Sequence, residues 1–169
     1  MDIQKKNEEV FAVIKQKFGF VPNLFKTLSV SPAVSEVYLR GFEAMEGASL
    51  DNREIQALNL AVSTENNCNY CKAAHTATGK GAGVSPEDLA LIKEGKSPKD
   101  EGLNALVTAA RLIVRKRGHL TEEELDTIGA MGVNRGKVYE IIAIIGLKTI
   151  SNYVNHIANT EIDREFQGG

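Results

Sequence analysis

Cysteine is scarce in this chain. Its 169 residues include only two cysteines, Cys68 and Cys71, which lie three positions apart. Two cysteines cannot build the disulfide framework that holds small secreted domains together. A bond between them would close a very small loop and would hardly constrain the unfolded chain. Such a bond would serve chemistry more than stability, and a reducing, cytoplasmic location fits this cysteine usage best.

An excess of charge and a long apolar run are also absent. The chain has 20 Lys+Arg and 22 Asp+Glu, so its formal net charge is −2, and nothing in this balance favours a nucleic-acid partner. No run of about 18 apolar residues occurs, so we expect no membrane-spanning segment. The polar residues 1–9 do not resemble a secretory signal peptide. Hydrophobic residues make up 43% of the chain, which is enough for one sizeable core.

Apolar residues recur at spacings of three and four along the whole sequence, and no segment alternates as a strand would. Ser31-Pro32 and Ser85-Pro86 are typical helix starts, and Thr121 with Glu124 forms a capping-box pattern. We therefore predict an all-α chain, a single domain over residues 1–169 with seven to nine helices. The predicted helical segments lie near 10–18, 32–45, 52–62, 68–79, 86–94, 102–117 and 134–159, with one more after Thr121. The polar tail beyond Asp163 is expected to fray.

The segment that carries chemistry is CNYCKAAH, residues 68–75, which we expect to begin a helix capped by Asn66 or Asn67. Residues three and four apart share a helix face, so Cys68, Cys71 and His75 would form one stripe. The helix start favours an anion and should lower the pKa of the Cys68 thiol. His75 would lie within reach to exchange a proton with Cys71. Together these are the parts of a peroxide-reducing dithiol: a thiolate, a proton donor and a resolving thiol.

Two other interpretations of this segment remain open. Cys68, Cys71 and His75 could bind zinc, with His119 or His156 as a distant fourth ligand. Structural zinc sites rarely take three ligands from one helix face, because tetrahedral coordination needs ligands from several directions. His119 follows a glycine and is expected to be solvated, whereas His156 is expected to have a packing or interface role. The two thiols could also be purely structural.

Several segments together resemble a known family. The runs LDNRE (50–54) and LAVS (60–63) precede the CxxCxxxH motif. Near the ends of the chain stand FVPNLF (20–25) and NHIANT (155–160), followed by Asp163. In these motifs, which span most of its length, the chain resembles the carboxymuconolactone decarboxylase-like superfamily. It is most similar to the alkylhydroperoxidase AhpD-like, peroxidase-related branch.

The resemblance implies an all-α fold that assembles as a homo-oligomer, a trimer or a hexamer. It implies a dithiol peroxidase with no metal or organic cofactor, acting on hydrogen peroxide or organic hydroperoxides. Cys71 would attack the peroxide, Cys68 would resolve the product into a disulfide, and His75 would belong to the proton relay. An external dithiol donor, a thioredoxin-like or lipoyl protein, would reopen the disulfide.

The sequence departs from the family pattern at one important position. Members usually have a relay glutamate twelve residues before the first cysteine, where this chain has Gln56. Glutamine forms hydrogen bonds but cannot shuttle a proton at neutral pH. Glu54, Glu65 or a neighbouring subunit could supply the missing carboxylate. Tyr70 stands where some members have a histidine between the cysteines.

Two alternative functions remain open, and the departure at Gln56 favours the first of them. A protein with a weakened site could be a non-enzymatic or redox-responsive oligomer of the same fold. A carboxymuconolactone decarboxylase-type enzyme is a further alternative, since that branch does not rely on a cysteine pair.

Overall fold

Helices make up almost all the regular structure in residues 3–168, which are the residues that the computed structural model describes. Within this range there are nine α-helices and no strand, so the prediction of an all-α fold with seven to nine helices is confirmed. The α-helices are α1 (Ile3–Phe18), α2 (Asn23–Leu28), α3 (Pro32–Ala44), α4 (Asn52–Glu65), α5 (Asn69–Gly81), α6 (Pro86–Lys93), α7 (Glu101–Lys116), α8 (Glu122–Ala130) and α9 (Arg135–Ala158). Two 3₁₀ turns, η1 (Met45–Gly47) and η2 (Arg164–Phe166), complete the list.

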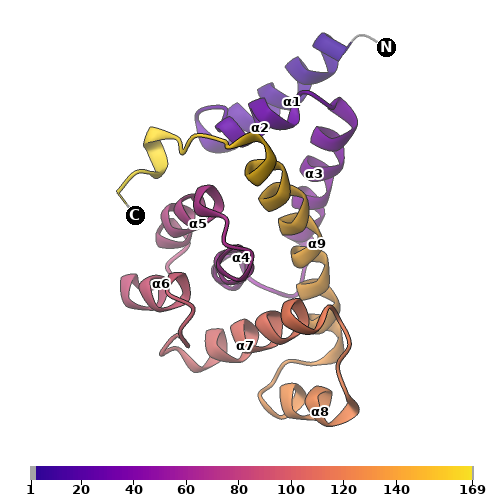
Figure 1. Cartoon of the computed structure of the whole chain (residues 1–169), viewed down its shortest axis with the longest axis vertical. Helices are drawn as coiled ribbons and strands as arrows, with labels where there is room; N and C mark the ends of the chain where they lie inside the picture. The colour runs from indigo at the N-terminus through magenta and orange to yellow at the C-terminus, as the bar shows by residue number, and fades with distance from the viewer. Residues whose placement is uncertain (1–2, 169) are drawn as a thin grey trace.

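Helix α4 is the central element of the fold. Figure 1 shows it nearly end-on, with α5, α6, α7 and α9 arranged around it, and it packs against all four. Its start is fixed by a capping box between Asp51 and Glu54, and every residue from 56 to 63 is buried. A helix surrounded on all sides must be covered all round, so even its polar residues face protein. Gln56 therefore points into the interior.

Two glycines let neighbouring helices approach closely beside the cysteine-bearing segment. A Cβ atom on Gly79 of α5 would lie 2.8 Å from Cδ2 of Leu89 and 3.8 Å from Cβ of Gln56. A Cβ atom on Gly41 of α3 would lie 2.5 Å from Cδ2 of Leu147 on α9. A larger residue at either position would crowd the leucine side chain that it faces. The two glycines thus make room for Leu89 of α6 against α5 and for Leu147 of α9 against α3.

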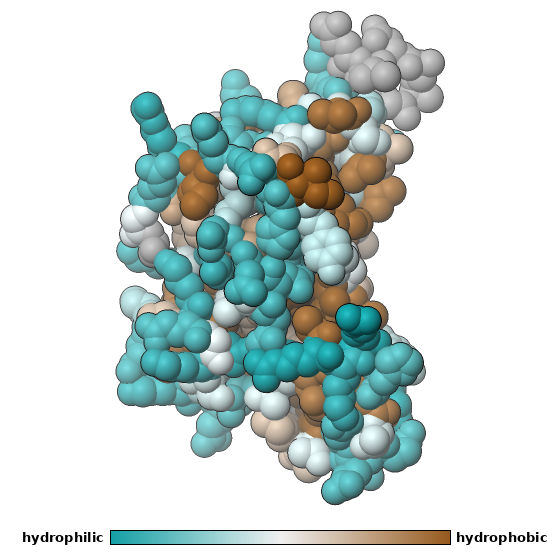
Figure 2. All heavy atoms as spheres, viewed as in Figure 1, coloured by the Kyte–Doolittle hydropathy of each residue, from teal (hydrophilic) through white to brown (hydrophobic). Residues whose placement is uncertain are grey.

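The buried apolar residues fall into separate clusters, and the cysteines belong to one of them. Cys68 and Cys71 pack in a cluster formed mainly by the N-terminal helices, with Ile14, Phe25 and Tyr38 among its members. Other clusters fill the space between α4, α7 and α9 and between α4 and α6. Figure 2 shows more apolar surface over the side where α1, α3 and α9 lie than over α5 to α7. Among the described helices, none has both the length and the apolar character that crossing a bilayer requires.

The C-terminal segment is docked on the body of the protein, so the expectation that it frays beyond Asp163 is wrong for residues 164–168. The Asp163 carboxylate accepts hydrogen bonds from the Asn23 N–H at 3.0 Å and from the Tyr70 hydroxyl at 2.6 Å. Phe166 is 7% exposed and packs edge-on against Phe20 and Tyr70. A single buried ring and one buried carboxylate fix a segment whose average composition is polar. The segment passes over α5 near its start (Figure 1).

The close contact between Gly79 and Leu89 predicts different effects of alanine at two glycines of α5. Gly81→Ala should raise the free energy of unfolding by about 0.5–1 kcal/mol, because its Cβ meets nothing and alanine favours the helix. Gly79→Ala should be less stable than Gly81→Ala by about 1–3 kcal/mol, because its Cβ crowds Leu89. Urea unfolding of both variants measures the difference. Equal stability of the two variants would show that the close approach at Gly79 has no energetic importance.

Candidate functional site

A tight turn between α4 and α5 positions both cysteines. Asn67 adopts a left-handed conformation with φ 55°, which asparagine tolerates better than most residues, and the Cys68 N–H donates back to the Ser63 carbonyl at 2.9 Å. The expected cap at Asn66 or Asn67 is wrong, because Cys68 itself is the N-cap of α5. Its Sγ accepts a hydrogen bond from the Cys71 N–H at 3.5 Å. Both thiols therefore lie in the first turn of α5, and each is only 1% exposed.

Helix α9 presents a stripe of buried polar side chains to the two thiols. The stripe consists of residues spaced at i, i+3, i+4 and i+7, namely Lys148, Ser151, Asn152 and Asn155. Asn155 Nδ2 lies 3.3 Å from Cys71 Sγ and 3.9 Å from Cys68 Sγ. Ser151 Oγ lies 4.0 Å from Cys71 Sγ. Sequence reasoning missed this stripe, although four polar residues at helical spacing in an apolar helix were a signal that could have revealed it.

Within the stripe, Asn152 connects α9 to the end of α4. Its Nδ2 donates to Ser63 Oγ at 3.3 Å, and its Oδ1 accepts from Asn66 Nδ2 at 2.9 Å. These bonds join α9 to the end of α4, immediately before the cysteine turn. These bonds thereby fix the position of the polar face of α9 relative to the two thiols.

His75 lies between Gln56 and Lys148. Its Nδ1 is 3.0 Å from Gln56 Oε1, and its Nε2 is 2.7 Å from Lys148 Nζ. Burial, and then the charge of Lys148, lower the pKa of His75 well below its ordinary value. The imidazole is therefore neutral at neutral pH, with the Lys148 ammonium donating to Nε2 and the Nδ1–H donating to Gln56. Lys148 also donates to the Tyr38 hydroxyl at 3.1 Å.

These contacts change the expected path of the proton. Among residues 3–168, no hydrogen bond joins His75 to either sulfur, so the expected direct exchange between His75 and Cys71 is not what the structure shows. Lys148 is the group that connects them, since it contacts His75 and acts on Cys71 through its charge. Lys148, which lies outside the CxxCxxxH motif, is thus the residue that links His75 to the thiols.

The two thiols have opposite pKa shifts. The hydrogen bond from Cys68, opposed by burial and assisted by the charge of Lys148, lowers the pKa of Cys71 to about 5. The same bond to Cys71, together with burial, raises the pKa of Cys68. The expectation that the helix start lowers the pKa of Cys68 is therefore wrong. Cys68 keeps its proton because it donates it to the Cys71 thiolate, and at neutral pH the pair holds one negative charge on Cys71.

The charge of the thiolate is matched by a buried ammonium. Lys148 is only 2% exposed. Burial by itself would lower the pKa of Lys148, but the interactions with Tyr38 and with the Cys71 thiolate outweigh it and raise that pKa. Lys148 is therefore cationic at neutral pH. Cys71 on α5 and Lys148 on α9 thus carry opposite buried charges that stabilise each other, and neither helix could provide this charge pair alone.

A small cavity of about 50 Å³ is lined by both Cys71 and Lys148. Cys71, His75 and Lys148 form its polar end, and its walls are apolar, made by Phe18, Pro22, Leu24, Phe25, Phe42 and Phe166. A volume of this size admits only a few water-sized molecules. The cavity gives a small polar reactant room beside Cys71.

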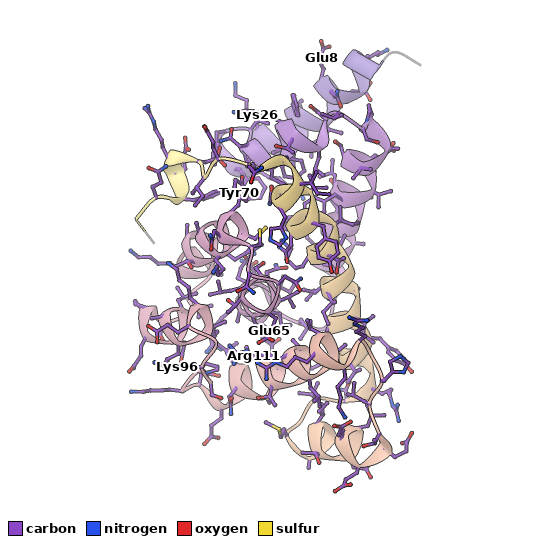
Figure 3. All side chains as sticks on the ribbon, viewed as in Figure 1. Glu8, Lys26, Glu65, Tyr70, Lys96 and Arg111 are labelled. Carbon is purple, nitrogen blue, oxygen red and sulfur yellow. The ribbon has the colours of Figure 1, made fainter. Side chains whose placement is uncertain are left out.

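Tyr70 is at the site but does not direct its hydroxyl toward the sulfurs. The hydroxyl donates to Asp163 and accepts from the Leu24 N–H at 3.2 Å. Burial and then the bond to Asp163 raise the pKa of Tyr70, so the phenol stays protonated. Figure 3 shows Tyr70 beside the C-terminal segment. The tyrosine closes one wall of the cavity and ties it to the tail.

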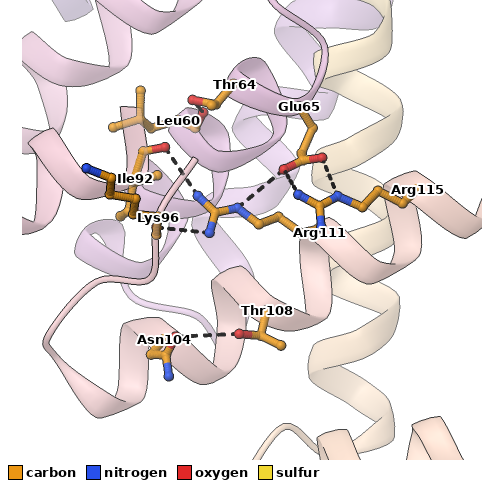
Figure 4. A network of polar contacts seen from close by, with 9 residues as sticks. All are labelled: Leu60, Thr64, Glu65, Ile92, Lys96, Asn104, Thr108, Arg111 and Arg115. Atoms are coloured by element: carbon orange, nitrogen blue, oxygen red, sulfur yellow. Dashed lines mark hydrogen bonds and ion pairs between the residues drawn. The ribbon is translucent and has the colours of Figure 1, made fainter. Parts of the chain in front are cut away.

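Neither candidate glutamate of the sequence replaces the relay carboxylate. Glu54 accepts from the Asp51 N–H at 2.9 Å and from Lys137 Nζ at 3.1 Å. Glu65 pairs with Arg115 at 2.7 Å and with Arg111 at 3.4 Å, on the side of α4 that faces α7 (Figures 3 and 4). Gln56 occupies the relay position and does contact His75. The side chain at the relay position, Gln56, is therefore neutral.

The two remaining histidines lie apart from the thiols. His119 is exposed, as expected, and His156 is exposed and stacks on Tyr153 with ring centroids 6.3 Å apart. In the part of the chain that the structure describes, no three or more His, Cys, Asp or Glu side chains form a group that could hold a metal ion. Zinc binding with His119 or His156 as fourth ligand therefore finds no support in the donor geometry.

Comparison with known protein families and curated sequences gives one match. Residues 32–94 match the model of the Carboxymuconolactone decarboxylase family, and this segment contains α3, α4, α5 and both cysteines. A search of curated protein sequences found no match. The match over this segment confirms the resemblance to the carboxymuconolactone decarboxylase-like superfamily that we inferred from the sequence.

Several solved structures share the whole fold at low sequence identity. An AhpD-core, peroxidase-related protein from Ralstonia eutropha JMP134 aligns with 98% of this chain and 91% of its own, at 20% identity and a TM-score of 0.87. A peroxidase-related protein from Silicibacter sp. TM1040 aligns with 97% and 88%, at 19% identity and a TM-score of 0.82. The debrominase Bmp8 aligns with 95% and 88%, at 19% identity and a TM-score of 0.77. The fold is therefore AhpD-like.

The charge pairing at the site predicts the titration of the thiols. The ultraviolet absorbance of thiolate should show a single ionisation with a midpoint near pH 5, at the pKa of Cys71. Lys148→Met should raise this midpoint, because the thiolate then loses its buried counter-charge. The matched control is Lys137→Met on the same helix, whose lysine pairs with Glu54. An unchanged midpoint in Lys148→Met would show that Lys148 does not stabilise the thiolate.

Proposed function

We propose that the protein is a thiol-dependent peroxidase in which Cys71 attacks the peroxide and Cys68 resolves the product. The observation that carries the proposal is the pair of opposite pKa shifts, which provides a thiolate at Cys71 and a proton-bearing thiol at Cys68. A nucleophile and a resolving thiol are the two sulfur species that this chemistry needs. The peroxidase-related proteins of the same fold support the assignment.

In the first step, the Cys71 thiolate attacks one peroxide oxygen, the O–O bond breaks, and a sulfenic acid forms. The leaving hydroxide takes up a proton and departs as water. Lys148 is suited to supply this proton, because the thiolate that stabilised its charge has just disappeared. A buried ammonium without a counter-ion becomes a better acid. His75 accepts a hydrogen bond from Lys148 at 2.7 Å and orients it.

In the second step, the Cys68 thiol attacks the sulfenic sulfur of Cys71, and a second water leaves. The resulting disulfide joins residues of one helical turn, which is a spacing that a disulfide accommodates. An external dithiol, carried by a thioredoxin-like or lipoyl protein, then reduces the disulfide by thiol–disulfide exchange. We further propose that the protein acts in the cytoplasm as a homo-oligomer, a trimer or a hexamer. Exposed apolar residues on α9, namely Tyr139, Ile142, Tyr153 and Ile157, support the oligomer.

The cavity favours the smaller of the two peroxide classes. At about 50 Å³ it has room for hydrogen peroxide beside Cys71, and a bulky organic hydroperoxide would have to displace the surrounding rings. Hydrogen peroxide is therefore the preferred substrate, and organic hydroperoxides are accepted more slowly.

Two cysteine variants test the proposed chemistry. Cys71→Ser should lower kcat/KM for hydrogen peroxide by about a thousandfold or more, because serine offers no thiolate. Cys68→Ser should still consume one equivalent of peroxide and then stop at a sulfenic acid that a dimedone reagent traps. In the wild type, both thiols should vanish together and return with a dithiol reductant. Full turnover by Cys71→Ser would overturn the assignment.

Gln56 favours a second candidate, a redox-responsive protein without efficient catalysis. A missing proton-transfer group costs about 10²–10⁴ in rate, so Gln56→Glu should restore a gain of that order if the site is weakened. We expect no such gain, because Lys148 already supplies the proton and a second buried anion would oppose the thiolate. Asn52→Asp is the control, since it adds the same charge to α4 without contacting His75. A gain of a hundredfold in Gln56→Glu alone would favour the second candidate.

The comparisons bear on two further activities, the decarboxylase alternative already raised from the sequence and a debrominase activity. The family model concerns a decarboxylase, and a cysteine-to-alanine variant of the debrominase Bmp8 has been solved with 2,3,4-tribromopyrrole. A decarboxylase activity that survives replacement of both cysteines by alanine would support the first. Release of bromide from brominated pyrroles, with loss of both thiols, would support the second. The small volume beside Cys71 argues against a polybrominated ring.

A further inference from the structure

A second and larger cavity is also lined by Lys148. It has a volume of about 430 Å³ and opens between α3, α4 and α9. Its walls include the apolar residues Phe42, Met45, Leu50, Ile55, Ile144 and Leu147. Tyr38, Phe42 and Lys148 line both this cavity and the small one at Cys71. Its volume is in the range of cavities that bind small organic molecules. We call it the α3–α4–α9 cavity.

The inner end of the α3–α4–α9 cavity has an amide without a partner. Asn59 on α4 lines it and is only 5% exposed. Within residues 3–168, no group forms a hydrogen bond with the Asn59 side chain. The Asn59 amide is not sealed off from solvent, so it is open to the cavity that it lines. A polar group of a ligand can replace water as its hydrogen-bond partner.

Lys148 supplies a charge at the same end of the cavity. Two of its three N–H groups donate to Tyr38 and to His75, and the third has no hydrogen-bond partner in the described part of the chain. The two acidic residues of the cavity bind other groups: Glu46 pairs with Lys17 at 2.6 Å, and the Asp51 carboxylate caps α4 by accepting from the Glu54 N–H at 2.7 Å. The cavity thus combines apolar walls with a cation and an amide at its inner end.

We propose that the α3–α4–α9 cavity binds a small organic monoanion with an apolar body, such as an aryl carboxylate. Its head group lies against Lys148 and Asn59, and it binds more tightly when Cys71 carries no negative charge. In the reduced protein, the Cys71 thiolate already neutralises Lys148. In the disulfide form, Lys148 has no counter-anion. An anion that binds beside it restores the charge pair, and Lys148 takes back from solvent the proton that it gave to the leaving hydroxide. Binding and the redox state of the thiols are therefore coupled, and the coupling is reciprocal.

The inference depends on the proposed function only in that Cys71 is the thiolate, and not on peroxide turnover. The disulfide form can be prepared with diamide, which takes two electrons from the thiol–thiolate pair. It also takes the Cys68 proton and one proton from solvent, and it becomes the hydrazine. A Cys71→Ala variant removes the negative charge with no oxidant. The two preparations reach the same charge at Lys148 by independent routes.

Calorimetric titration with 2-naphthoate tests the proposal, with the neutral 2-naphthamide as the comparison ligand. The oxidised protein and Cys71→Ala should bind 2-naphthoate about tenfold more tightly than the reduced wild type. The affinity for 2-naphthamide should be the same in all three. No saturable binding of 2-naphthoate, or equal affinity in all three forms, would overturn the proposal.

Variants in the cavity connect the binding to this site. Asn59→Leu, of similar volume, should weaken 2-naphthoate binding about tenfold and leave peroxide turnover unchanged. Asn104→Leu on α7 is the matched control and should bind as the wild type does. If Asn59→Leu does not fold, Ile55→Phe narrows the cavity instead and should also weaken binding. Unaltered binding in these variants would contradict the proposed location. State-dependent binding in a protein without peroxide turnover would overturn the peroxidase assignment alone.

Discussion

The electrostatic attraction between the buried Cys71 thiolate and the buried Lys148 ammonium is the interaction on which the site depends. Each charge would be too costly inside the protein without the other. The pair joins the first turn of α5 to the middle of α9, and both helices pack against α4. The remaining polar groups serve this pair: Tyr38 and His75 accept from the ammonium, and Asn155 lies beside the sulfur. The fold can be understood as the scaffold that keeps the charges of Cys71 and Lys148 close together and shielded from water.

The ion pair gives a physical reason for Gln56. A glutamate beside His75 would add a second buried anion, while the site contains a single buried cation. With glutamine, the thiolate and the ammonium balance, and the neutral imidazole connects them to a neutral amide. The departure from the family pattern at position 56 therefore fits a site in which the proton-carrying group is Lys148. Position 56 still orients the imidazole, since Gln56 Oε1 accepts from Nδ1–H and fixes the tautomer.

Local spacing made most of the fold and half of the site predictable from the sequence. The spacing of apolar residues predicted the helices, and the CxxCxxxH motif placed Cys68, Cys71 and His75 on one helix. The partners on α9 were not predicted, because Lys148 and Asn155 meet the thiols only through the tertiary packing of α9 on α5. The assignment of the lower pKa failed because the helix dipole is weaker than the hydrogen bond from Cys68 to Cys71. The docked tail was missed because one ring, Phe166, outweighs the polar residues around it.

The position of Lys148 between two cavities has a consequence for how the protein could respond to oxidation. The Lys148 side chain lines both the small cavity at Cys71 and the α3–α4–α9 cavity. Any change in the charge of Cys71 therefore alters the field in the second cavity, and no helix has to move. Coupling of this kind needs only proximity and a low local dielectric, which a buried site provides. Conversely, an anion held by Lys148 would weaken its hold on the thiolate and make Cys71 less reactive. The lysine that activates the thiol is thus also the group through which a bound ligand would control it.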